Sequence, residues 1–412
     1  MSFFGIFPCL EGKKVLILGM DGYIGWPLAL RLLARGHQVT GVDSFITRRR
    51  VREVHSDSLI PIDSMAERIR KASRTFGEPG FVRFDVTDPR RLYSILEKEK
   101  PDAIVHLAEQ RSAPYSMIGL KQATETMMKN IVSTMNLIYA TKDIVPESHI
   151  LKLGTMGEYG TPNIDIPEGF FEVNYHGRSD TLPFPKFAGS WYHWTKVHDS
   201  NNLMFANRLW GTAITDVMQG VVYGTRTSEI ESSSSHTRFD IDEVWGTALN
   251  RFCAQAIAGL PITPYGKGGQ TRGFLSLEDS VQCLTIAIEN PPKNGEYRVF
   301  NQYDEHYSVN ELASKVVEVF SSLYPDRKKP GILHTANPRI EKEEHYYNPE
   351  NVKLRELGYR TARSLETEIS IILQDVMKYS GRIRRLKDVI MPRTSWKESS
   401  GKSAVAGTEK KK

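Results

Sequence analysis

Apolar runs alternate with amphipathic segments along the first half of the chain. Short runs rich in Val, Ile and Leu are separated by stretches in which apolar residues recur with helical spacing. Strands that are apolar on both faces and separated by helices indicate a parallel sheet covered on both sides. The expected strands are residues 13–19, 37–43, 81–86, 102–108, 149–155 and 213–224. The pattern therefore predicts a doubly wound α/β core.

The regular alternation ends near the middle of the chain, and this predicts two domains. We expect residues 12–220 to form a nucleotide-binding domain. Its basic insert, residues 44–80, predicts two solvated amphipathic helices or, alternatively, an arm that faces phosphate or a partner. The Ser-rich residues 225–239 predict a loop over the site. Residues 221–395 should form a smaller α/β domain that mainly holds substrate, with some segments returning to the core, and residues 396–412 a disordered basic tail.

Composition is that of an ordinary globular protein. The chain has 412 residues, 40% of them hydrophobic, and its net charge of +5 is too small to argue for nucleic acid. The three cysteines, Cys9, Cys253 and Cys283, follow no disulfide or metal-ligand spacing, so we expect no metal and a reducing, cytoplasmic location. Because no apolar run approaches the ~20 residues of a membrane-spanning helix and no signal peptide is evident, we expect no membrane insertion.

A glycine-rich turn follows the first strand directly. Gly19, Gly22 and Gly25 lead into a helix, as in Rossmann-type folds, where the turn brings backbone N–H groups close to a pyrophosphate. Asp43, at the end of the second strand, is placed to bind the adenosine ribose, which favours NAD over NADP. Arg48 and the two arginines after it leave NADP open.

The remaining cofactor contacts are predicted from their places at strand ends and in the turn. Asp85 follows the third strand and either touches the adenine or caps the next helix. The turn and the ends of these strands supply the predicted set Gly19, Asp21, Gly22, Tyr23, Ile24, Gly25, Asp43, Ser44, Arg48, Asp85 and Val86.

A tyrosine and a lysine share one face of a later predicted helix. Tyr192 and Lys196 are four residues apart, and an ammonium beside a phenol lowers the phenol pKa, so that tyrosinate can act as a base. Thr155, at the end of the fifth strand, supplies a hydroxyl toward the same pocket. These three residues form the predicted catalytic centre.

Five runs in fixed order carry a resemblance to a known family. With these runs the chain resembles the extended short-chain dehydrogenase/reductase family of nucleotide-sugar epimerases and dehydratases, over nearly its whole length. The runs are GMDGYIG at 19–25, HLAEQ at 106–110, LGTMGEYG at 153–160, YHWTK at 192–196 and YGKGGQTRGFLSLEDSV at 265–281. Longer irregular runs resemble the branch that makes UDP-sulfoquinovose: EQRSAPYSM at 109–117, HGRSDTLPFPK at 176–186 and EEHYYN at 343–348.

The resemblance implies a redox-neutral reaction of UDP-glucose with sulfite. NAD takes hydride from carbon 4 while Tyr192 accepts the hydroxyl proton, water leaves across carbons 5 and 6, sulfite adds, and hydride returns. Lys196 would hold the nicotinamide ribose, with Tyr192 beside the same cofactor, and Thr155 would bind the 4-oxygen of the sugar. The resemblance also places an amide near the cofactor, at Asn130.

The chain departs from the sugar dehydratases that the family contains. Those enzymes follow the threonine with an acid pair, whereas this chain has Met156 and Gly157 at these positions, and then Glu158. The predicted replacements for the missing acid are His193 and Glu158, with Glu109 ranked below them. Structural roles compete, since Glu158 could bind backbone and His193 could be a core histidine.

Several cationic and amide side chains are candidates for the substrate. The resemblance places Arg272 at the diphosphate, where a guanidinium binds phosphate well. Arg339 is a second candidate for the diphosphate, His345 one for the uridine end, and Gln219 one for the sugar. Arg111, with help from Gln110, is predicted to hold the substrate or the sulfonate; the alternative is a buried Glu109–Arg111 ion pair that only supports the loop.

Family members are commonly dimers, so a homodimer that uses the helix of Tyr192 is expected. Whether sulfite arrives free or from a delivering protein is left open. Two alternatives also stay open: a UDP-glucose 4-epimerase or dehydratase on the same scaffold, and a non-catalytic member of the fold that binds dinucleotide, a partner or RNA.

Overall fold

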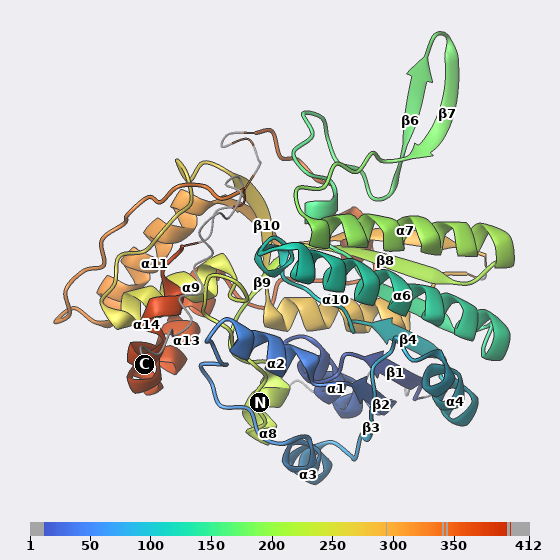
Figure 1. The fold of residues 1–412 in the computed structure, drawn as a ribbon, viewed down its shortest axis with the longest axis horizontal. Helices are drawn as coiled ribbons and strands as arrows, with labels where there is room; N and C mark the ends of the chain where they lie inside the picture. The colour runs from blue at the N-terminus through green and yellow to red at the C-terminus, as the bar shows by residue number, and fades with distance from the viewer. Residues whose placement is uncertain (1–11, 294, 340–341, 343–344, 394–395, 397–412) are drawn as a thin grey trace, which may run out of the picture.

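A seven-stranded parallel sheet forms the centre of the computed structural model, which describes residues 12–293, 295–339, 342, 345–393 and 396 (Figure 1). The strand order is β11-β8-β5-β4-β1-β2-β3. Their bounds are β1 (Lys14–Leu18), β2 (Gln38–Asp43), β3 (Gly80–Arg83), β4 (Ala103–His106), β5 (His149–Leu153), β8 (Ile214–Gln219) and β11 (Tyr297–Gln302). All six neighbouring pairs run parallel, which confirms the predicted Rossmann-type doubly wound fold.

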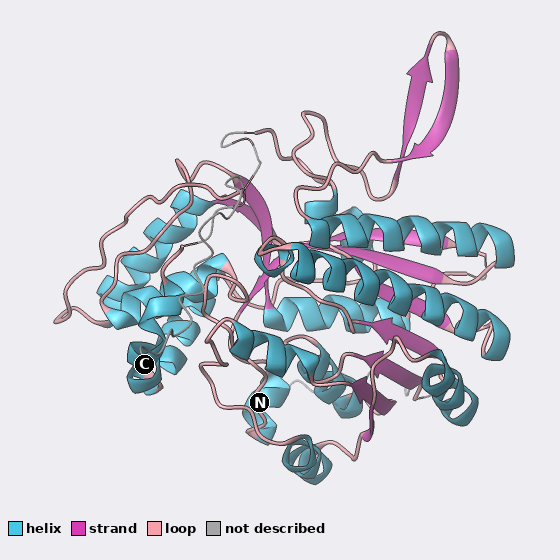
Figure 2. Cartoon of the chain, viewed as in Figure 1, coloured by secondary structure: helices cyan, strands magenta, loops and turns pink. Residues whose placement is uncertain are grey.

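Helices cover both faces of this sheet, as Figure 2 shows. One face carries α1 (Gly25–Ala34), α10 (Leu277–Glu289) and α12 (Val352–Glu356), whose apolar side chains form one core cluster with β1. The other face carries α4 (Pro89–Glu99), α6 (Leu120–Ile144) and α7 (Trp191–Trp210). Strands covered on both sides must be apolar on both faces, which is the pattern the sequence has.

A smaller region lies beside the carboxyl ends of the strands. It contains a three-stranded sheet of β9 (Val221–Tyr223), β10 (Thr271–Ser276) and β12 (Glu305–Ser308). Four helices share a second apolar core with it: α9 (Ala248–Ala258), α11 (Val309–Leu323), α13 (Leu365–Lys378) and α14 (Ser380–Ile390). Because β11 lies in the main sheet, the second half of the chain does return to the core, while the exact domain boundary stays a prediction.

The run 213–224 is two strands rather than one. A Cβ on Gly220 would lie 2.7 Å from the carbonyl oxygen of Gly273, so the backbones of β8 and β10 approach closely at this glycine. The chain turns there from the large sheet into the small one. Alternation of apolar residues alone could not separate the two strands.

The basic insert contains the two predicted helices, α2 (Ile46–Glu53) and α3 (Met65–Thr75). They are not simply solvated, because Arg50 and Arg68 are only 2% and 0% exposed. Arg50 pairs with Glu125 of α6, and Arg68 pairs with Asp21 of the glycine-rich turn. The insert is therefore tied to the nucleotide-binding core by buried ion pairs.

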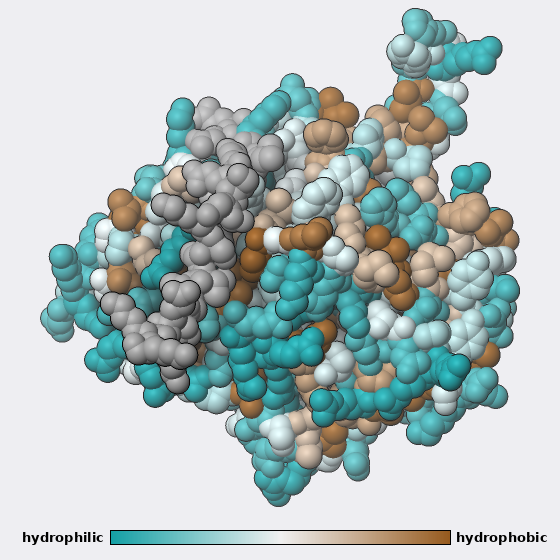
Figure 3. Space-filling model, in the orientation of Figure 1, coloured by the Kyte–Doolittle hydropathy of each residue, from teal (hydrophilic) through white to brown (hydrophobic). Residues whose placement is uncertain are grey.

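A hairpin that the sequence analysis did not predict stands away from the body of the molecule (Figures 1 and 3). It is formed by β6 (Phe170–Tyr175) and β7 (Arg178–Pro183), joined by His176 and Gly177 with φ of 48° and 72°. Two central residues with positive φ are typical of the type I′ turn.

Two further expectations concern the termini and membranes. Of the predicted tail at 396–412, only Trp396 lies within the described residues. Among the described helices, none combines the length and apolar character that a membrane span requires.

Candidate active site

The predicted site residues meet at the carboxyl edge of the main sheet. Because the strands are parallel, the turns after β1, β2, β3, β4 and β5 all open at this edge. The short helix α5 (Ala113–Ser116) and the 3-10 helix η1 (Met156–Glu158) lie in two of these turns.

The glycine-rich turn is shaped by close backbone contacts. Gly19 has φ of +95°, and a Cβ there would lie 2.7 Å from the backbone of Leu107. A Cβ on Gly25 would lie 2.3 Å from the carbonyl oxygen of Gly19. Larger residues do not fit, and α1 begins with its N–H groups at this edge, so the turn fits a dinucleotide pyrophosphate.

Asp43 lies where an adenosine ribose is expected, at the end of β2. Its carboxylate accepts the backbone N–H groups of Asp21 at 2.9 Å and Phe45 at 2.7 Å. Burial and the nearby Asp21 carboxylate raise the pKa of Asp43 to about 6. Asp21 itself binds Arg48 at 2.6 Å and Arg68 at 2.7 Å, so its carboxylate serves the insert.

The Ser-rich segment 225–239 packs on the glycine-rich turn. The hydroxyl of Thr237 donates to the carbonyl of Tyr23 at 2.9 Å, and the indole of Trp26 donates to Ser235 at 3.1 Å. The phenol of Tyr23 donates to Gly224 at 2.7 Å. The predicted loop over the site therefore contains a helix, α8 (Ser228–Ser233), and is fastened by hydrogen bonds.

The other predicted cofactor contacts lie at this edge with local partners. Asp85 binds Lys129 at 2.5 Å, and the cap of α4 is Asp88, so the alternative role of Asp85 as this cap is wrong. Asn130 bonds the backbone of Gln110 at 2.8 and 3.0 Å. The carbonyl of Val86 accepts from Asn136, the hydroxyl of Ser44 accepts from Ile46, and Ile24 precedes α1.

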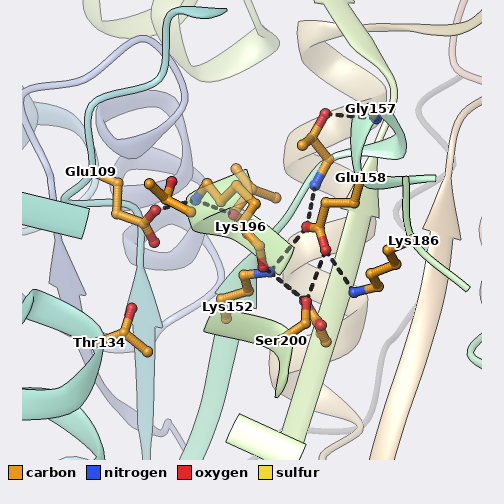
Figure 4. A network of polar contacts seen from close by, with 12 residues as sticks. Glu109, Thr134, Lys152, Gly157, Glu158, Lys186, Lys196 and Ser200 are labelled. Atoms are coloured by element: carbon orange, nitrogen blue, oxygen red, sulfur yellow. Dashed lines mark hydrogen bonds and ion pairs between the residues drawn. The ribbon is translucent and has the colours of Figure 1, made fainter. Parts of the chain in front are cut away.

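Tyr192 and Lys196 lie on the buried side of α7. This helix begins at Ser190, whose hydroxyl accepts the N–H of His193 at 3.2 Å. The ammonium of Lys196 donates to the carbonyl of Leu153 at 2.7 Å and pairs with Glu109 at 2.7 Å (Figure 4). Burial raises the pKa of Tyr192, and the Lys196 ammonium opposes this.

A second buried lysine lies beneath this pair. The ammonium of Lys152, on β5, is 3.1 Å from Glu158 and 3.1 Å from Asp216, and it donates to Ser200 at 2.9 Å (Figure 4). It also donates to the carbonyl of Lys196 at 3.2 Å. Lys152 thus joins β5, β8 and α7 directly below the predicted catalytic residues.

Glu158 is occupied by structural contacts. One of its oxygens binds the Thr155 N–H at 3.2 Å and Lys152, and the other binds Lys186 at 2.6 Å and Ser200 at 3.0 Å. Burial alone would raise the pKa of Glu158, but the ammoniums of Lys152 and Lys186 hold it at about 2. A carboxylate held ionised in this way has no proton to donate, so the structure disfavours Glu158 as the general acid.

His193 occupies the space beside Gly157. A Cβ on Gly157 would lie 2.5 Å from the Nε2 atom of His193, and Nδ1 is 3.0 Å from the hydroxyl of Ser190. Thr155 precedes Gly157 and accepts its N–H at 3.1 Å. The imidazole therefore lies beside the turn in which the sugar dehydratases carry their acid pair.

Glu109, Gln110 and Arg111 point to three different partners. Glu109 pairs with Lys196, so the alternative Glu109–Arg111 ion pair is wrong. Arg111 pairs with Asp240 at 2.5 Å and lies over the ring of Trp245. Gln110 is 1% exposed, and its side chain binds Ser112 in its own loop and Thr126 of α6, so it does not face a substrate.

Two of the predicted substrate residues come together in the smaller region. Arg272 of β10 is 3.0 Å from Nε2 of His345, although the two are far apart in the sequence. Arg339 lies elsewhere, with its guanidinium over Trp396. Gln219, at the end of β8, accepts from the hydroxyl of Ser280 at 3.0 Å.

Sequence reasoning missed the buried charges below the site. Lys152, Asp199 and Asp216 are all fully buried. Two signals could have indicated them: a lysine inside the apolar run of β5, and an aspartate one helical turn after Lys196.

Comparison with known proteins places the chain in a family. Residues 15–301 match the model of the NAD dependent epimerase/dehydratase family. The chain belongs to this family. It is 50% identical to UDP-sulfoquinovose synthase of Sulfolobus acidocaldarius, over 93% of this chain and 98% of that protein. It is 45% identical to the chloroplastic UDP-sulfoquinovose synthase of Spinacia oleracea, over 94% of this chain and 80% of that protein.

Solved structures of the epimerase/dehydratase family share the fold. A UDP-glucuronic acid 4-epimerase from Bacillus cereus, in complex with NAD and a UDP-sugar, has a TM-score of 0.67 and 20% identity, covering 89% of this chain and 99% of its own. UDP-glucose 4-epimerase from Thermotoga maritima, with UDP-glucose, has a TM-score of 0.65 and 18% identity, with the same coverage. At these identities the likeness concerns the fold alone.

Proposed function

We propose that this protein converts UDP-glucose and sulfite to UDP-sulfoquinovose, with NAD as a cofactor that each turnover regenerates. The observation that carries the proposal is the 50% identity to a synthase of this product along nearly the whole of both chains. The solved 4-epimerases share only the fold, at 18% and 20% identity, and give the epimerase alternative far less support.

Tyr192 is the proton acceptor at the 4-hydroxyl of the sugar. It lies one helical turn from Lys196, whose ammonium favours the tyrosinate form. Bound NAD supplies the hydride acceptor for carbon 4 and later returns the hydride. Thr155, at the end of β5, binds the 4-oxygen.

His193 is the acid and base for the elimination of water. Oxidation at carbon 4 acidifies the hydrogen on carbon 5, and an imidazole can remove this proton and protonate the leaving 6-hydroxyl. The Ser190 hydroxyl, 3.0 Å from Nδ1, orients the imidazole. The main rival, Glu158, is held ionised by two lysines.

Cationic side chains bind the anionic parts of the reactants. Arg272 and His345 together suit the diphosphate and uridine end, since they approach within 3.0 Å across two segments. Arg339 and Gln219 stay candidates for substrate contacts. Arg111, with 32% of its side chain exposed, holds sulfite or the sulfonate. The Arg111 guanidinium then binds both this anion and the carboxylate of Asp240.

A homodimer through α6 and α7 follows from their shared surface. The two helices pack side by side (Figure 1), and both carry exposed apolar side chains. Met128 and Tyr139 of α6 are 59% and 46% exposed, and Phe205 and Leu209 of α7 are 60% and 52% exposed. Such a stripe on paired helices suits a bundle of four helices.

The location and the source of sulfite are also proposals. Cys253 and Cys283 are buried free thiols, which suits a reducing compartment such as the cytoplasm. Sulfite could be taken up free or from a delivering protein, and a comparison of turnover with and without cell extract at low sulfite separates the two.

The direct test is incubation of the pure protein with NAD, UDP-glucose and sulfite, followed by mass analysis of the nucleotide sugars. A sulfonated UDP-hexose is expected, and Tyr192→Phe should abolish it. UDP-galactose without a sulfonated product would contradict the proposal and favour the epimerase. Salt-sensitive RNA retention that survives Tyr192→Phe, without any sugar product, would favour a non-catalytic role.

A further inference from the structure

Glu109 is a buried carboxylate at the end of β4, next to the proposed catalytic residues. It follows a tight turn in which its N–H donates to the carbonyl of Leu107 at 2.9 Å. Its side chain is only 2% exposed, and one oxygen lies 2.7 Å from the ammonium of Lys196, which is 5% exposed (Figure 4). A charge buried this deeply needs a partner, and here the partner is a lysine of the active site.

The pair holds Lys196 from two sides. The ammonium donates to the carbonyl of Leu153 on β5 and pairs with Glu109 in the turn after β4, while the lysine itself is on α7. Three elements therefore fix one ammonium. A lysine has a long side chain with many rotamers, so two such partners remove much of its freedom before any ligand binds.

His106 lies beside the other oxygen of Glu109. Its Nε2 is 3.3 Å from that oxygen, and the imidazole also contacts the hydroxyl of Thr134 at 3.2 Å. Burial lowers the pKa of His106 to about 4, so the ring is neutral near pH 7. The neutral His106 ring therefore packs against Glu109 without neutralising it, and the carboxylate charge is directed at Lys196.

The charges around Lys196 come from several elements. Burial alone would lower the pKa of Lys196, but Glu109 and Tyr192 raise it, and the net shift is upward. Lys152 opposes this effect and Asp199 supports it. The lysine therefore stays an ammonium, and Glu109 is the largest single charge that keeps it so.

The Glu109 carboxylate also acts on Tyr192, where it disfavours the tyrosinate form that the reaction needs. Burial raises the pKa of Tyr192 and Lys196 lowers it, while Glu109 and then Glu158 raise it and Lys152 lowers it. Glu109 thus fixes the lysine that favours tyrosinate and also weakens that preference.

We propose that Glu109 is a positioning residue, which holds the Lys196 ammonium beside Tyr192 and limits how strongly that ammonium favours tyrosinate. The inference rests on the proposed function, because it assigns Glu109 to the oxidation at carbon 4. It differs from an acid–base role at carbon 5, since both oxygens of Glu109 are directed at Lys196 and His106.

The test measures the reduction of bound NAD by UDP-glucose, without sulfite, as a function of pH in single turnovers of the holoenzyme. In Glu109→Gln the acid limb of this pH–rate profile should shift to lower pH by on the order of one unit, because a negative charge near Tyr192 is lost. The plateau rate should fall about tenfold, because Lys196 loses its anchor. Glu109→Asp keeps the charge, so its limb should match the wild type while its plateau falls.

A matched control exists at the opposite end of the sheet. Glu289 also lies between a histidine and a cation, with His37 at 3.1 Å and Arg35 as the ion-pair partner, and is 10% exposed. Glu289→Gln should leave the pH profile unchanged. Thermal melting and NAD content report whether each variant is folded.

The outcomes are separable. If the acid limb of the pH–rate profile lies at the same pH in Glu109→Gln as in the wild type, the inference is contradicted, whether or not the plateau rate falls. Normal NAD reduction with loss of water elimination also contradicts it and makes Glu109 a catalytic acid or base. If the wild type does not reduce NAD with UDP-glucose, the proposed function fails instead. The tyrosinate absorbance difference between each protein and its Tyr192→Phe counterpart then still decides whether Glu109 shifts the pKa of Tyr192.

Discussion

Replacing Lys152 by methionine tests whether the buried charges below the site hold the protein together. Methionine keeps most of the volume but removes an ammonium that is 3.1 Å from both Glu158 and Asp216. After the change Glu158 keeps Lys186 at 2.6 Å, whereas Asp216 keeps only the phenol of Tyr297 at 2.7 Å. The uncompensated charge therefore lies mainly on Asp216.

The expected loss in the free energy of unfolding is about 3–5 kcal/mol, the usual cost of removing one partner of a buried ion pair. The lower end applies if Asp216 takes up a proton. A domain of ordinary stability has about 5–15 kcal/mol in total, so the variant should be strongly destabilised but still fold. Activity should fall as well, since Lys152 also donates to the carbonyl of Lys196 at 3.2 Å.

The assay is urea unfolding followed by tryptophan fluorescence, with the midpoint compared between variants. Lys98→Met is the surface control: its side chain is 74% exposed and lies 3.0 Å from Glu99, so a change within about 1 kcal/mol is expected. Adding Asp216→Asn to Lys152→Met should recover more than about 1 kcal/mol, because the two sites are coupled. A loss below about 1 kcal/mol in Lys152→Met, or strict additivity in the double variant, would refute the reasoning.

Three further predictions concern neighbouring groups. Glu158, with its pKa of about 2 against an ordinary 4.5, stabilises the fold above pH 4.5 and loses this as pH falls toward 2. As the pH falls toward 2, the free energy of unfolding should therefore decrease by on the order of 3 kcal/mol more in the wild type than in Glu158→Gln. Urea unfolding midpoints measured across this pH range would reveal the difference. Gly157→Ala should lower the rate of sulfosugar formation at least tenfold, because its Cβ displaces the His193 imidazole; Gly331→Ala, which has open space, should not, and equal rates would contradict the proposed contact. Because burial raises the pKa of Asp43 to about 6, calorimetry should find that NAD binds about fivefold more weakly below pH 6 than above it. In Asp43→Asn the affinity for NAD should not change with pH in this range.

The sequence by itself determined the sheet, the glycine-rich turn after β1 and the helix that carries Tyr192 and Lys196. Apolar periodicity is a local property, and both the doubly wound sheet and the long helix of Tyr192 follow from it. The glycines of the turn could also be identified, because only residues without a Cβ fit backbone contacts as close as those of Gly19 and Gly25.

Only the tertiary structure decided which charges meet. Glu109 is far from Lys196 in the sequence but pairs with it, whereas Arg111, only two residues after Glu109, pairs with Asp240. The imidazole of His193 lies beside Gly157 because η1 and α7 pack together, which no spacing rule predicts. Pairing of buried charges depends on distances of a few ångströms between separate elements, since the energy of an ion pair falls with distance and rises with burial. Periodicity predicts the elements, whereas the chemistry of this site depends on how their ends are packed.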